Sequence, residues 1–478
     1  MYFNSLSFAV FLPVVFVLYW FVTNRNLRLQ NALLLVASYF FYSCWDYRFL
    51  LLLVFSTFLD YYTGIKMYES RTKKIRTFWF WLSVCTNVGF LGFFKYYNFF
   101  AASFARALSE VGIHSDPWVL NVILPVGISF YTFHGLSYVI DIYKGRISPE
   151  RNFVDYSVFV SFFPLLVAGP IERATHLLPQ IKRERVFDPS KMIDGLRQIL
   201  WGLFKKMVIA DRCAEFVNPI FAHSQTYSGA TLALGAFLFA IQIYCDFSGY
   251  SDIALGTARL LGIDLLRNFN YPYFSRDIAE FWRRWHISLS SWFRDYLYIP
   301  LGGSKGSKWK VIRNTWIIFL VSGFWHGANW TFIAWGGLNA LFIMPLVLFG
   351  KNRVHLETVA RGKVLPTLRE AVQIAATFAM TTLAWIVFRA DSIPQAIHYV
   401  KQIFSRSLFT LPQVHAEKLG VLIGLFVILE WLGRDQPYAI ARLGIGSPRL
   451  VRWSFYYALV FIICWFSGAE QQFIYFQF

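Results

Sequence analysis

The stretch SGFWHGANWTFIAWGGLNALF, residues 322–342, is largely apolar and about as long as one membrane-crossing helix. Roughly 20 helical residues are needed to cross a hydrocarbon core of about 30 Å. His326 interrupts this run, between Trp325 and Asn329. Ionisable side chains are costly in such surroundings, so they tend to face a cavity or a partner and to mark function. His326 is therefore the first candidate functional residue.

Burial of His326 would disfavour the charged imidazolium and leave a ring nitrogen free to accept a proton. A general base that activates a hydroxyl group needs this property. The surrounding glycines would let backbones and a substrate come close. A histidine that is hydrogen-bonded inside a helix bundle is an equally good interpretation, and the residues alone leave both open.

A second stretch, FWRRWHISLSSWFRDYLYIPLGG at 281–303, contains His286 among aromatic and basic residues. Its apolar residues do not form one stripe, which favours a helix lined by protein or lying at a membrane interface. Glu280 precedes Arg283 and Arg284 at the spacing of local ion pairs. His286 is incidental in one interpretation. In the other, the arginines form a cationic floor for phosphates and His286 is a second polar group of the site.

A third stretch, YCDFSGYSDIALG at 244–256, opens a central block over 244–342 that we expect to carry the chemistry. Asp246 and Asp252 lie six residues apart, which places them about 120° apart around a helix. Ser248 shares a face with Asp252, and Tyr250 shares one with Asp246. We predict a polar or substrate-lining network here rather than an acid–base pair.

The rest of the chain indicates an all-α polytopic membrane protein. Of its 478 residues 56% are apolar and only 15% are charged, which excludes an ordinary soluble fold. No repeat or linker divides it, so we expect one membrane domain over 1–478. Apolar segments lie at about 6–22, 31–43, 47–65, 78–100, 119–140, 154–171, 194–211, 230–248, 311–333, 335–349, 371–390, 418–432 and 453–468.

Lysine and arginine number 45 against 27 acidic residues, giving a formal charge of +18. The basic residues gather in short stretches between apolar segments, among them Lys182 to Lys206, which favours cytoplasmic loops over nucleic-acid binding. Acidic substrates such as phosphates are the alternative partner for this charge. This orientation places both termini, including the tail 469–478, on the outer side. The first segment lacks a basic start and a cleavage site and is expected to be retained.

Several classes of chemistry have no signature in the sequence. The five cysteines are scattered and predict neither a disulfide framework nor a zinc site, and no metal is expected. The Walker A, HExxH and DxD patterns do not occur, and the GxSxG match at 302–306, GGSKG, lies in a short basic, glycine-rich stretch that does not read as a strand-to-helix elbow. ATP-driven transport, zinc proteolysis, serine hydrolysis and metal-dependent glycosyl transfer therefore lose support.

The motifs WHISLSSWFRDYLYIPLGG (285–303) and FWHGANWTFIAWGGLNA (324–340) resemble the membrane-bound O-acyltransferase family, in its bacterial alginate O-acetyltransferase branch. The opening MYFNSLSFAVFLPVVFVLYW and the runs VGISFYTFHGLSYVIDIYKG, FFPLLVAGPIER and DFSGYSDIALG extend the likeness over most of the chain. It implies a ring of roughly 11 to 13 transmembrane or re-entrant helices around a thin central region with a cytoplasmic funnel.

The resemblance also implies an activity. Acetyl-CoA would donate an acetyl group from the cytoplasm for O-acetylation of an extracytoplasmic polysaccharide, such as alginate, peptidoglycan or cellulose. His326 falls on the catalytic histidine of the family, and His286 on its second site position. Asp246, Asp252, Arg283, Arg284, Trp325 and Asn329 are the expected substrate-binding residues. The expected location is the bacterial inner membrane, among membrane lipids, with a secreted or anchored periplasmic acetyltransferase of the SGNH type as partner.

The C-terminal FIYFQF, 473–478, fits the pattern FxYxxF, which resembles the terminal motif of the small membrane companion in teichoic acid D-alanylation. In that system the tyrosine is implicated as an acyl relay, so Tyr475 is a candidate catalytic residue. An aromatic anchor at the membrane interface is the alternative.

Two other functions stay open. One is a transporter or flippase for an acylated or lipid-linked sugar, although transporters often contain two related halves and none is evident here. The other is a non-catalytic membrane scaffold that recruits a secreted acetyltransferase.

Overall fold

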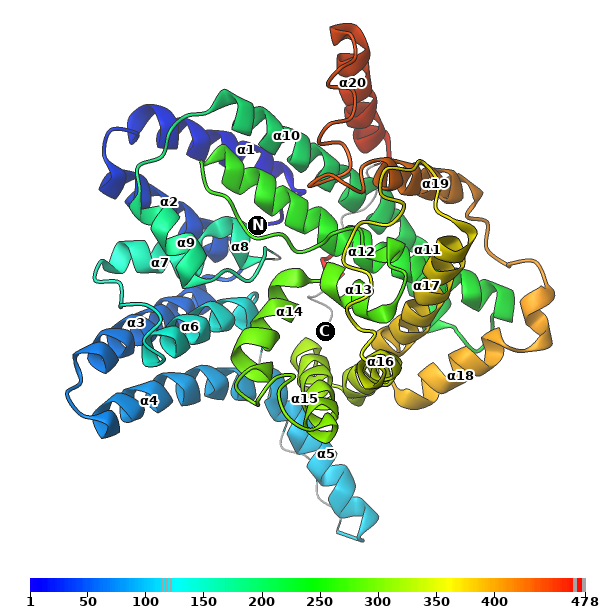
Figure 1. Cartoon of the computed structure of the whole chain (residues 1–478), viewed down its shortest axis with the longest axis horizontal. Coiled ribbons are helices and arrows are strands. Elements are labelled where there is room, and N and C mark those ends of the chain that lie inside the picture. The colour runs from blue at the N-terminus through cyan, green and yellow to red at the C-terminus, as the bar shows by residue number, and fades with distance from the viewer. Residues whose placement is uncertain (114–115, 117–118, 121–122, 168, 467–470, 475–478) are drawn as a thin grey trace. The chain divides into compact units, whose positions relative to one another are not determined.

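A computed structural model describes residues 1–113, 116, 119–120, 123–167, 169–466 and 471–474. All regular elements within these ranges are helices (Figure 1), which confirms the all-α prediction. The contacts divide the chain into two compact units. Unit 1 comprises residues 1–191 and 257–266, and unit 2 comprises 192–256 and 267–478. The single membrane domain stays a prediction.

Unit 1 is built mainly from the first third of the chain, coloured blue to cyan in Figure 1. Its helices are α1 (Leu6–Val17), η1 (Leu18–Val22), α2 (Leu27–Ser43), α3 (Tyr47–Glu69), α4 (Lys73–Leu91), η2 (Gly92–Tyr96), α5 (Tyr97–Glu110), α6 (Ile128–Tyr143), α7 (Phe153–Ser161), α8 (Phe163–Leu166) and α9 (Ala174–Lys182).

Helices α3, α4 and α6 pack against one another in unit 1 (Figure 1). The buried Asp60 of α3 accepts hydrogen bonds at Oδ1 from the Ser83 hydroxyl at 2.6 Å and the Asn87 amide at 2.8 Å. Ser56 donates to Asn87 at 2.8 Å. Because lipid offers no hydrogen-bond partners, polar groups between membrane helices are stable only when other protein groups satisfy them. This network therefore holds α3 and α4 together.

Most of the later helices belong to unit 2, except that the first residues of α10 and the last residues of α12 are assigned to unit 1. They are α10 (Pro189–Leu203), η3 (Phe204–Ala210), α11 (Asp211–Ala222), α12 (Gly229–Leu260), η4 (Pro272–Phe274), α13 (Ile278–Arg284), α14 (Ile287–Phe293), η5 (Arg294–Tyr298), α15 (Lys308–His326), α16 (Trp330–Leu348), α17 (Leu368–Arg389), α18 (Ile393–Ile403), η6 (Arg406–Phe409), α19 (Glu417–Leu432) and α20 (Arg449–Phe466).

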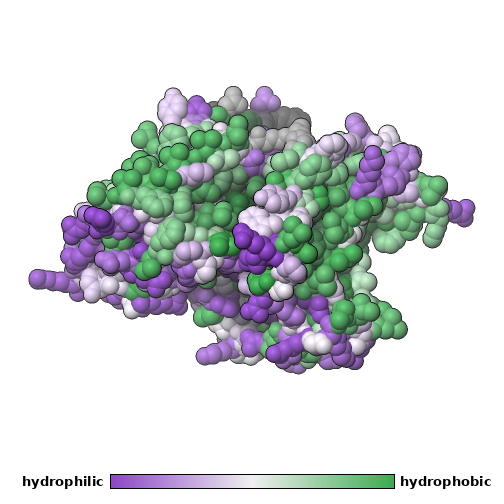
Figure 2. Space-filling model, turned by 90° about the horizontal axis from the view of Figure 1, so that it is seen from above, coloured by the Kyte–Doolittle hydropathy of each residue, from purple (hydrophilic) through white to green (hydrophobic). Residues whose placement is uncertain are grey.

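Within the described ranges, six helical segments are long and apolar enough to cross a membrane: 47–69, 73–110, 229–260, 330–348, 368–389 and 449–466. Shorter apolar segments lie at Leu6–Val22 and Phe153–Leu166. Figure 2 shows broad areas of hydrophobic surface on the face that it draws, with hydrophilic residues gathered in separate patches. Large apolar side chains such as Leu51, Trp81 and Phe461 are exposed. The chain is a multi-pass membrane protein.

Two predicted segments are divided differently in the structure. The apolar run 311–333 is not one helix, because α15 ends at His326 and α16 starts at Trp330. Gly327 is extended between them, and Asn329 caps α16 by accepting a hydrogen bond from the backbone of Thr331 at 3.1 Å. The stretch 281–303 is likewise broken, into α13, α14 and η5.

Glycines bring α15 and α16 into close contact. A Cβ atom added at Gly323 would collide with the carbonyl oxygen of Phe332, and one added at Gly336 with that of Phe319. Small residues let membrane helices approach closely enough to gain packing energy along their backbones. The position of His326, at the end of α15, therefore depends on this helical hairpin, which Figure 1 shows as adjacent ribbons.

Candidate active site

His326 lies at the C-terminal end of α15, in an aromatic cluster of unit 2. Only 5% of it is exposed. Its ring centroid lies 4.8 Å from that of Trp325, 5.1 Å from Trp335 and 5.5 Å from Phe388. These rings come from three consecutive long helices, α15, α16 and α17. The predicted burial of His326 is confirmed.

His286 lies between α13 and α14 in a conformation that is unusual for a residue with a side chain. Its φ is 43° and its ψ is 56°, in the left-handed region. It is 1% exposed, and within the described ranges neither ring nitrogen has a hydrogen-bond partner. Such strain costs about 1–3 kcal/mol and is concentrated at functional sites. A buried polar group without a partner is also costly, so His286 is a strong site candidate.

The histidine His134 in unit 1 shows the ordinary alternative. Its Nε2 accepts a hydrogen bond from the backbone N–H of Glu172 at 3.1 Å, and Nδ1 lies 3.4 Å from the carbonyl oxygen of Val160. It is as buried as His286 but has protein partners at both nitrogens. Burial alone therefore does not distinguish a functional histidine from a structural one, whereas hydrogen bonding does.

The backbone around His286 is fixed by a short segment at 268–271. The N–H of Ile287 donates to the carbonyl of Asn268 at 2.8 Å, and the N–H of Asn270 donates to that of Arg284 at 3.0 Å. The Ser288 hydroxyl donates to the Asn268 side chain, whose amide donates to Ser251 of α12 at 2.9 Å. These bonds hold His286 in its left-handed conformation against α12.

Trp325 links the two histidines. Its ring lies 4.8 Å from that of His326 and 6.2 Å from that of His286, centroid to centroid. Phe247 of α12 lies 4.7 Å from His286 on an edge-on approach. The two histidines, 40 positions apart in the sequence, therefore belong to one buried aromatic cluster. Trp325 contacts both rings, and its predicted role in substrate binding stays a prediction.

Asp246 and Asp252 are each paired with a buried lysine. The ammonium group of Lys205 lies 2.6 Å from Asp252 and donates to Ser248 at 2.9 Å. That of Lys206 lies 2.7 Å from Asp246 and 2.7 Å from Asp211. The two adjacent lysines thus form ion pairs with aspartates on two separate faces of α12, which confirms the predicted rotation of Asp246 and Asp252 away from each other around the helix.

The prediction that the basic stretch ends at Lys206 in a cytoplasmic loop is wrong for its last two residues. Lys205 and Lys206 are 2% and 1% exposed, and both belong to η3 inside unit 2. The available signal was their position inside the apolar segment 194–211, where charge is costly without a partner. An aspartate for each lysine was present in the 244–256 motif.

The C-terminal segment enters the core of unit 2. Phe473 and Ile474 are 0% and 1% exposed. The N–H of Ile474 donates to Asp246 at 2.7 Å, and Lys206 donates to the carbonyl of Gln471 at 3.1 Å. The Phe473 ring lies 5.9 Å from that of Phe247, which contacts His286. Tyr475, the predicted relay, lies outside the described residues.

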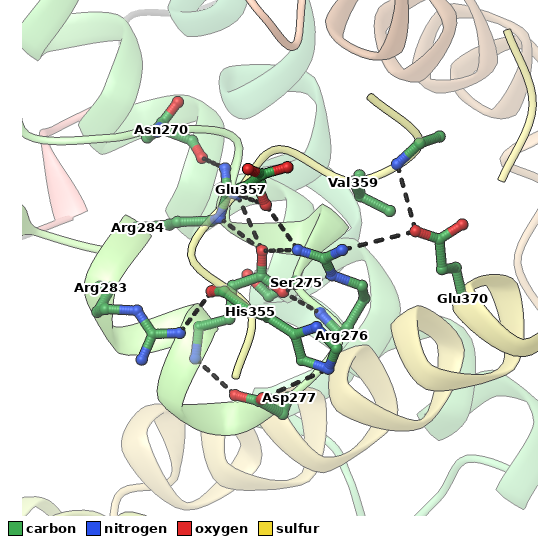
Figure 3. Close-up of polar contacts among 12 residues, drawn as sticks. Asn270, Ser275, Arg276, Asp277, Arg283, Arg284, His355, Glu357, Val359 and Glu370 are labelled. Carbon is green, nitrogen blue, oxygen red and sulfur yellow. Dashed lines mark hydrogen bonds and ion pairs between the residues drawn. The ribbon is translucent and has the colours of Figure 1, made fainter. Parts of the chain in front are cut away.

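Arg283 and Arg284 hold a loop in the structure (Figure 3). Arg284 bonds Glu280 at 2.9 Å and the carbonyl of Glu357 at 3.2 Å. Arg283 donates to the carbonyls of residues 352 and 355 at 2.6 and 2.8 Å, so the predicted Glu280 pair forms with Arg284 only. Phosphate binding by these two arginines stays a prediction.

Asn329 is used as a helix cap. Its amide also donates to the carbonyl of Asp391 at 3.1 Å, and its side chain is only partly buried. These contacts give it a structural role at the start of α16. Substrate binding by Asn329, Asp246 and Asp252 stays a prediction.

Comparison with known proteins decides the family. A sequence profile of the membrane-bound O-acyltransferase family, MBOAT, matches residues 146–376, which include both site histidines. The probable alginate O-acetylase AlgI of Pseudomonas aeruginosa is 37% identical over 447 residues, covering 92% of this chain and 82% of the relative. The chain belongs to the membrane-bound O-acyltransferase family. It is therefore a membrane O-acyltransferase with multiple membrane passes.

Other relatives of this membrane-bound O-acyltransferase act on different polymers. The peptidoglycan O-acetyltransferase of Helicobacter pylori is 35% identical over 430 residues, covering 84% of this chain and 79% of that protein. The teichoic acid D-alanyltransferase of Streptococcus thermophilus is 29% identical over 316 residues, covering 61% and 75%. The names of these relatives all describe the transfer of an acyl group, but they differ in the acyl group that is transferred and in the polymer that accepts it.

Proposed function

We propose that this O-acyltransferase takes an acetyl group from cytoplasmic acetyl-CoA and passes it across the inner membrane for O-acetylation of an extracytoplasmic polysaccharide. The single observation that carries the proposal is the buried pair His286 and His326 at one indole ring, with His286 strained and lacking hydrogen-bond partners among the described residues. The relatives' names, alginate O-acetylase and peptidoglycan O-acetyltransferase, support acetyl as the acyl group.

In the proposed reaction, His326 removes the proton from an acceptor hydroxyl as its oxygen attacks the thioester carbonyl. A new carbon–oxygen bond forms, the carbon–sulfur bond breaks, and coenzyme A leaves as its thiol after taking up the proton. A neutral, desolvated imidazole suits this step because it can accept a proton at neutral pH. His286, with donor capacity that the described protein does not use, orients the donor or stabilises the developing oxyanion.

The acceptor in this scheme is Tyr475 or a serine of a secreted SGNH-type partner, which completes transfer to the polymer. The buried course of Phe473 and Ile474 beside Phe247 supports the first choice, because Tyr475 is the next residue. The outward location of both termini, and the periplasmic partner, belong to the same proposal. The polymer itself is set by the partner.

The test uses the purified full-length chain in proteoliposomes with radiolabelled acetyl-CoA inside and its polysaccharide acceptor system outside. We expect labelled acceptor and free thiol from the wild type, and a 100-fold or greater loss with His326→Ala, because general base catalysis contributes about 10² to 10⁴ in rate. The matched control is His134→Ala, which removes a buried histidine of unit 1. Normal turnover by folded His326→Ala would remove this residue from the chemistry, and movement of an intact acylated sugar would indicate a transporter.

A further inference from the structure

Unit 2 contains an apolar cavity of about 370 Å³ that the reaction described above does not use. Its volume lies within the usual range for small-molecule sites, about 300–1,000 Å³. It is bounded by α12 and α17, which are candidate membrane spans, by α19 and by the region around η4. Its lining residues include Tyr244, Tyr273, Ala375, Phe378, Glu430 and Trp431.

Two layers of aromatic rings stand between this cavity and the histidines. The outer layer, Tyr244, Tyr273 and Phe378, lines the cavity itself. Within it, the Tyr273 ring lies 5.2 Å from Tyr244 and 5.0 Å from Phe378. We call these three residues the outer wall.

The inner wall consists of Phe269, Trp285 and Trp385. Trp285 lies 5.9 Å from Tyr273 of the outer wall, 5.1 Å from Phe269 and 4.9 Å from Trp385. Phe269 contacts the His286 ring at 6.5 Å. Trp385 lies 5.6 Å from Trp335, the ring that contacts His326.

Hydrogen bonds fix the outer wall in place. The Tyr273 hydroxyl donates to the carbonyl of Ala240 at 2.6 Å, and the Tyr244 hydroxyl donates to the buried Glu430 at 2.6 Å. Breaking such a bond in a buried site leaves a polar group unsatisfied, so the tyrosines resist displacement. An acyl group at the histidines therefore meets fixed rings in the direction of the cavity.

We propose that the outer and inner walls limit the acyl group to a short chain, with Tyr273 and Trp385 as the specificity-determining residues. The cavity behind them accepts the hydrocarbon tail of a longer acyl thioester once these rings are removed. Its lining suits that tail and no polar ligand, since Glu430 is already bonded to Tyr244 and Trp201. The inference rests on the proposed acyl transfer and adds its chain-length limit.

The experiment compares acetyl-CoA, butanoyl-CoA and octanoyl-CoA as donors for the full-length chain in proteoliposomes, with thiol release as the readout. The variants are Tyr273→Ala, Trp385→Ala and their combination. If the alanine variants fail to fold, Tyr273→Leu replaces Tyr273→Ala in the same comparison. We expect the combined variant, which removes one ring from each wall, to raise the octanoyl-to-acetyl rate ratio at least tenfold, since one methylene group in an apolar pocket already discriminates about 10–200-fold. Each single variant leaves one wall intact and should raise the ratio less.

Two controls test whether the gain requires this cavity and this direction. Trp431→Ala removes an aromatic side chain from the same cavity, where it contacts Phe274 rather than the inner wall, and should leave the ratio unchanged. Adding Ala375→Trp to the combined variant refills the cavity and should reverse the gain.

A folded combined variant that transfers acetyl but keeps the wild-type ratio would overturn the inference, as would an equal gain from Trp431→Ala. A failure of the proposed function itself would give a different result from a failure of this inference. In that case the wild type itself releases no thiol from acetyl-CoA.

Discussion

Lys206 offers a direct test of how buried charge stabilises the protein. Its ammonium group is 1% exposed and lies 2.7 Å from one carboxylate oxygen of Asp211 and 2.7 Å from one of Asp246. Lys206→Met removes the charge and keeps a flexible side chain of similar shape. Removal of one partner from a buried ion pair costs about 3–5 kcal/mol, because it leaves an uncompensated charge. Here two carboxylates lose their counter-charge, so we expect the upper part of that range.

The assay is thermal unfolding of the detergent-purified protein at one scan rate, because unfolding of such proteins is commonly irreversible. At roughly 2 °C per kcal/mol for a large domain, the apparent Tm should fall by about 8–10 °C. Arg361→Met is the control, since its pair with Glu357 at 3.1 Å is exposed and worth less than about 1 kcal/mol. Lys206→Met with Asp246→Asn should recover part of the loss. A Tm within about 1 °C of wild type for Lys206→Met would refute the reasoning.

Two further expectations concern packing and pH. Gly323→Ala should abolish the peak of folded protein on size-exclusion chromatography, because the added Cβ atom would collide with the Phe332 carbonyl. Gly337→Ala should be tolerated, since the nearest atoms to its added Cβ lie at 3.6 and 3.8 Å. Equal yields of the two folded variants would contradict this expectation. The side-chain hydrogen bond with Glu172 raises the pKa of His176 above 6.5 in the folded protein. The stability that this protonated histidine contributes is therefore complete below pH 6.5 and is lost as the pH rises through the folded pKa. The Tm difference between wild type and His176→Gln should therefore shrink from pH 6 to pH 9, and a constant difference would contradict the pairing.

The long membrane helices were predictable because a bilayer imposes both length and apolarity on a segment. The run 371–390 corresponds to α17, Leu368–Arg389, and 453–468 to α20, Arg449–Phe466. Short helices such as α9 and α18 were missed because they are amphipathic and carry no long apolar run. Their existence depends on the surfaces that they cover, which a local pattern does not contain.

The candidate site was only partly predictable for a similar reason. His326 and His286 were marked by charge in apolar surroundings and by the family motifs. The left-handed backbone of His286 depends on hydrogen bonds with residues 268–270, and the pairing of Lys205 with Asp252 joins residues 47 positions apart. Such contacts arise from tertiary packing, so the sequence indicated the participants without their partners.

The central claim is that His286 and His326 form one catalytic unit at Trp325. Its most direct test is the single-turnover rate of thiol release from acetyl-CoA for the wild type, each histidine-to-alanine variant and the double variant. Residues that act as a unit have strongly non-additive effects. We predict a loss of at least about 100-fold for His326→Ala, a large loss for His286→Ala, and a double variant no slower than the slower single variant. Near-normal rates in either folded single variant, or losses that multiply in the double variant, would contradict the claim.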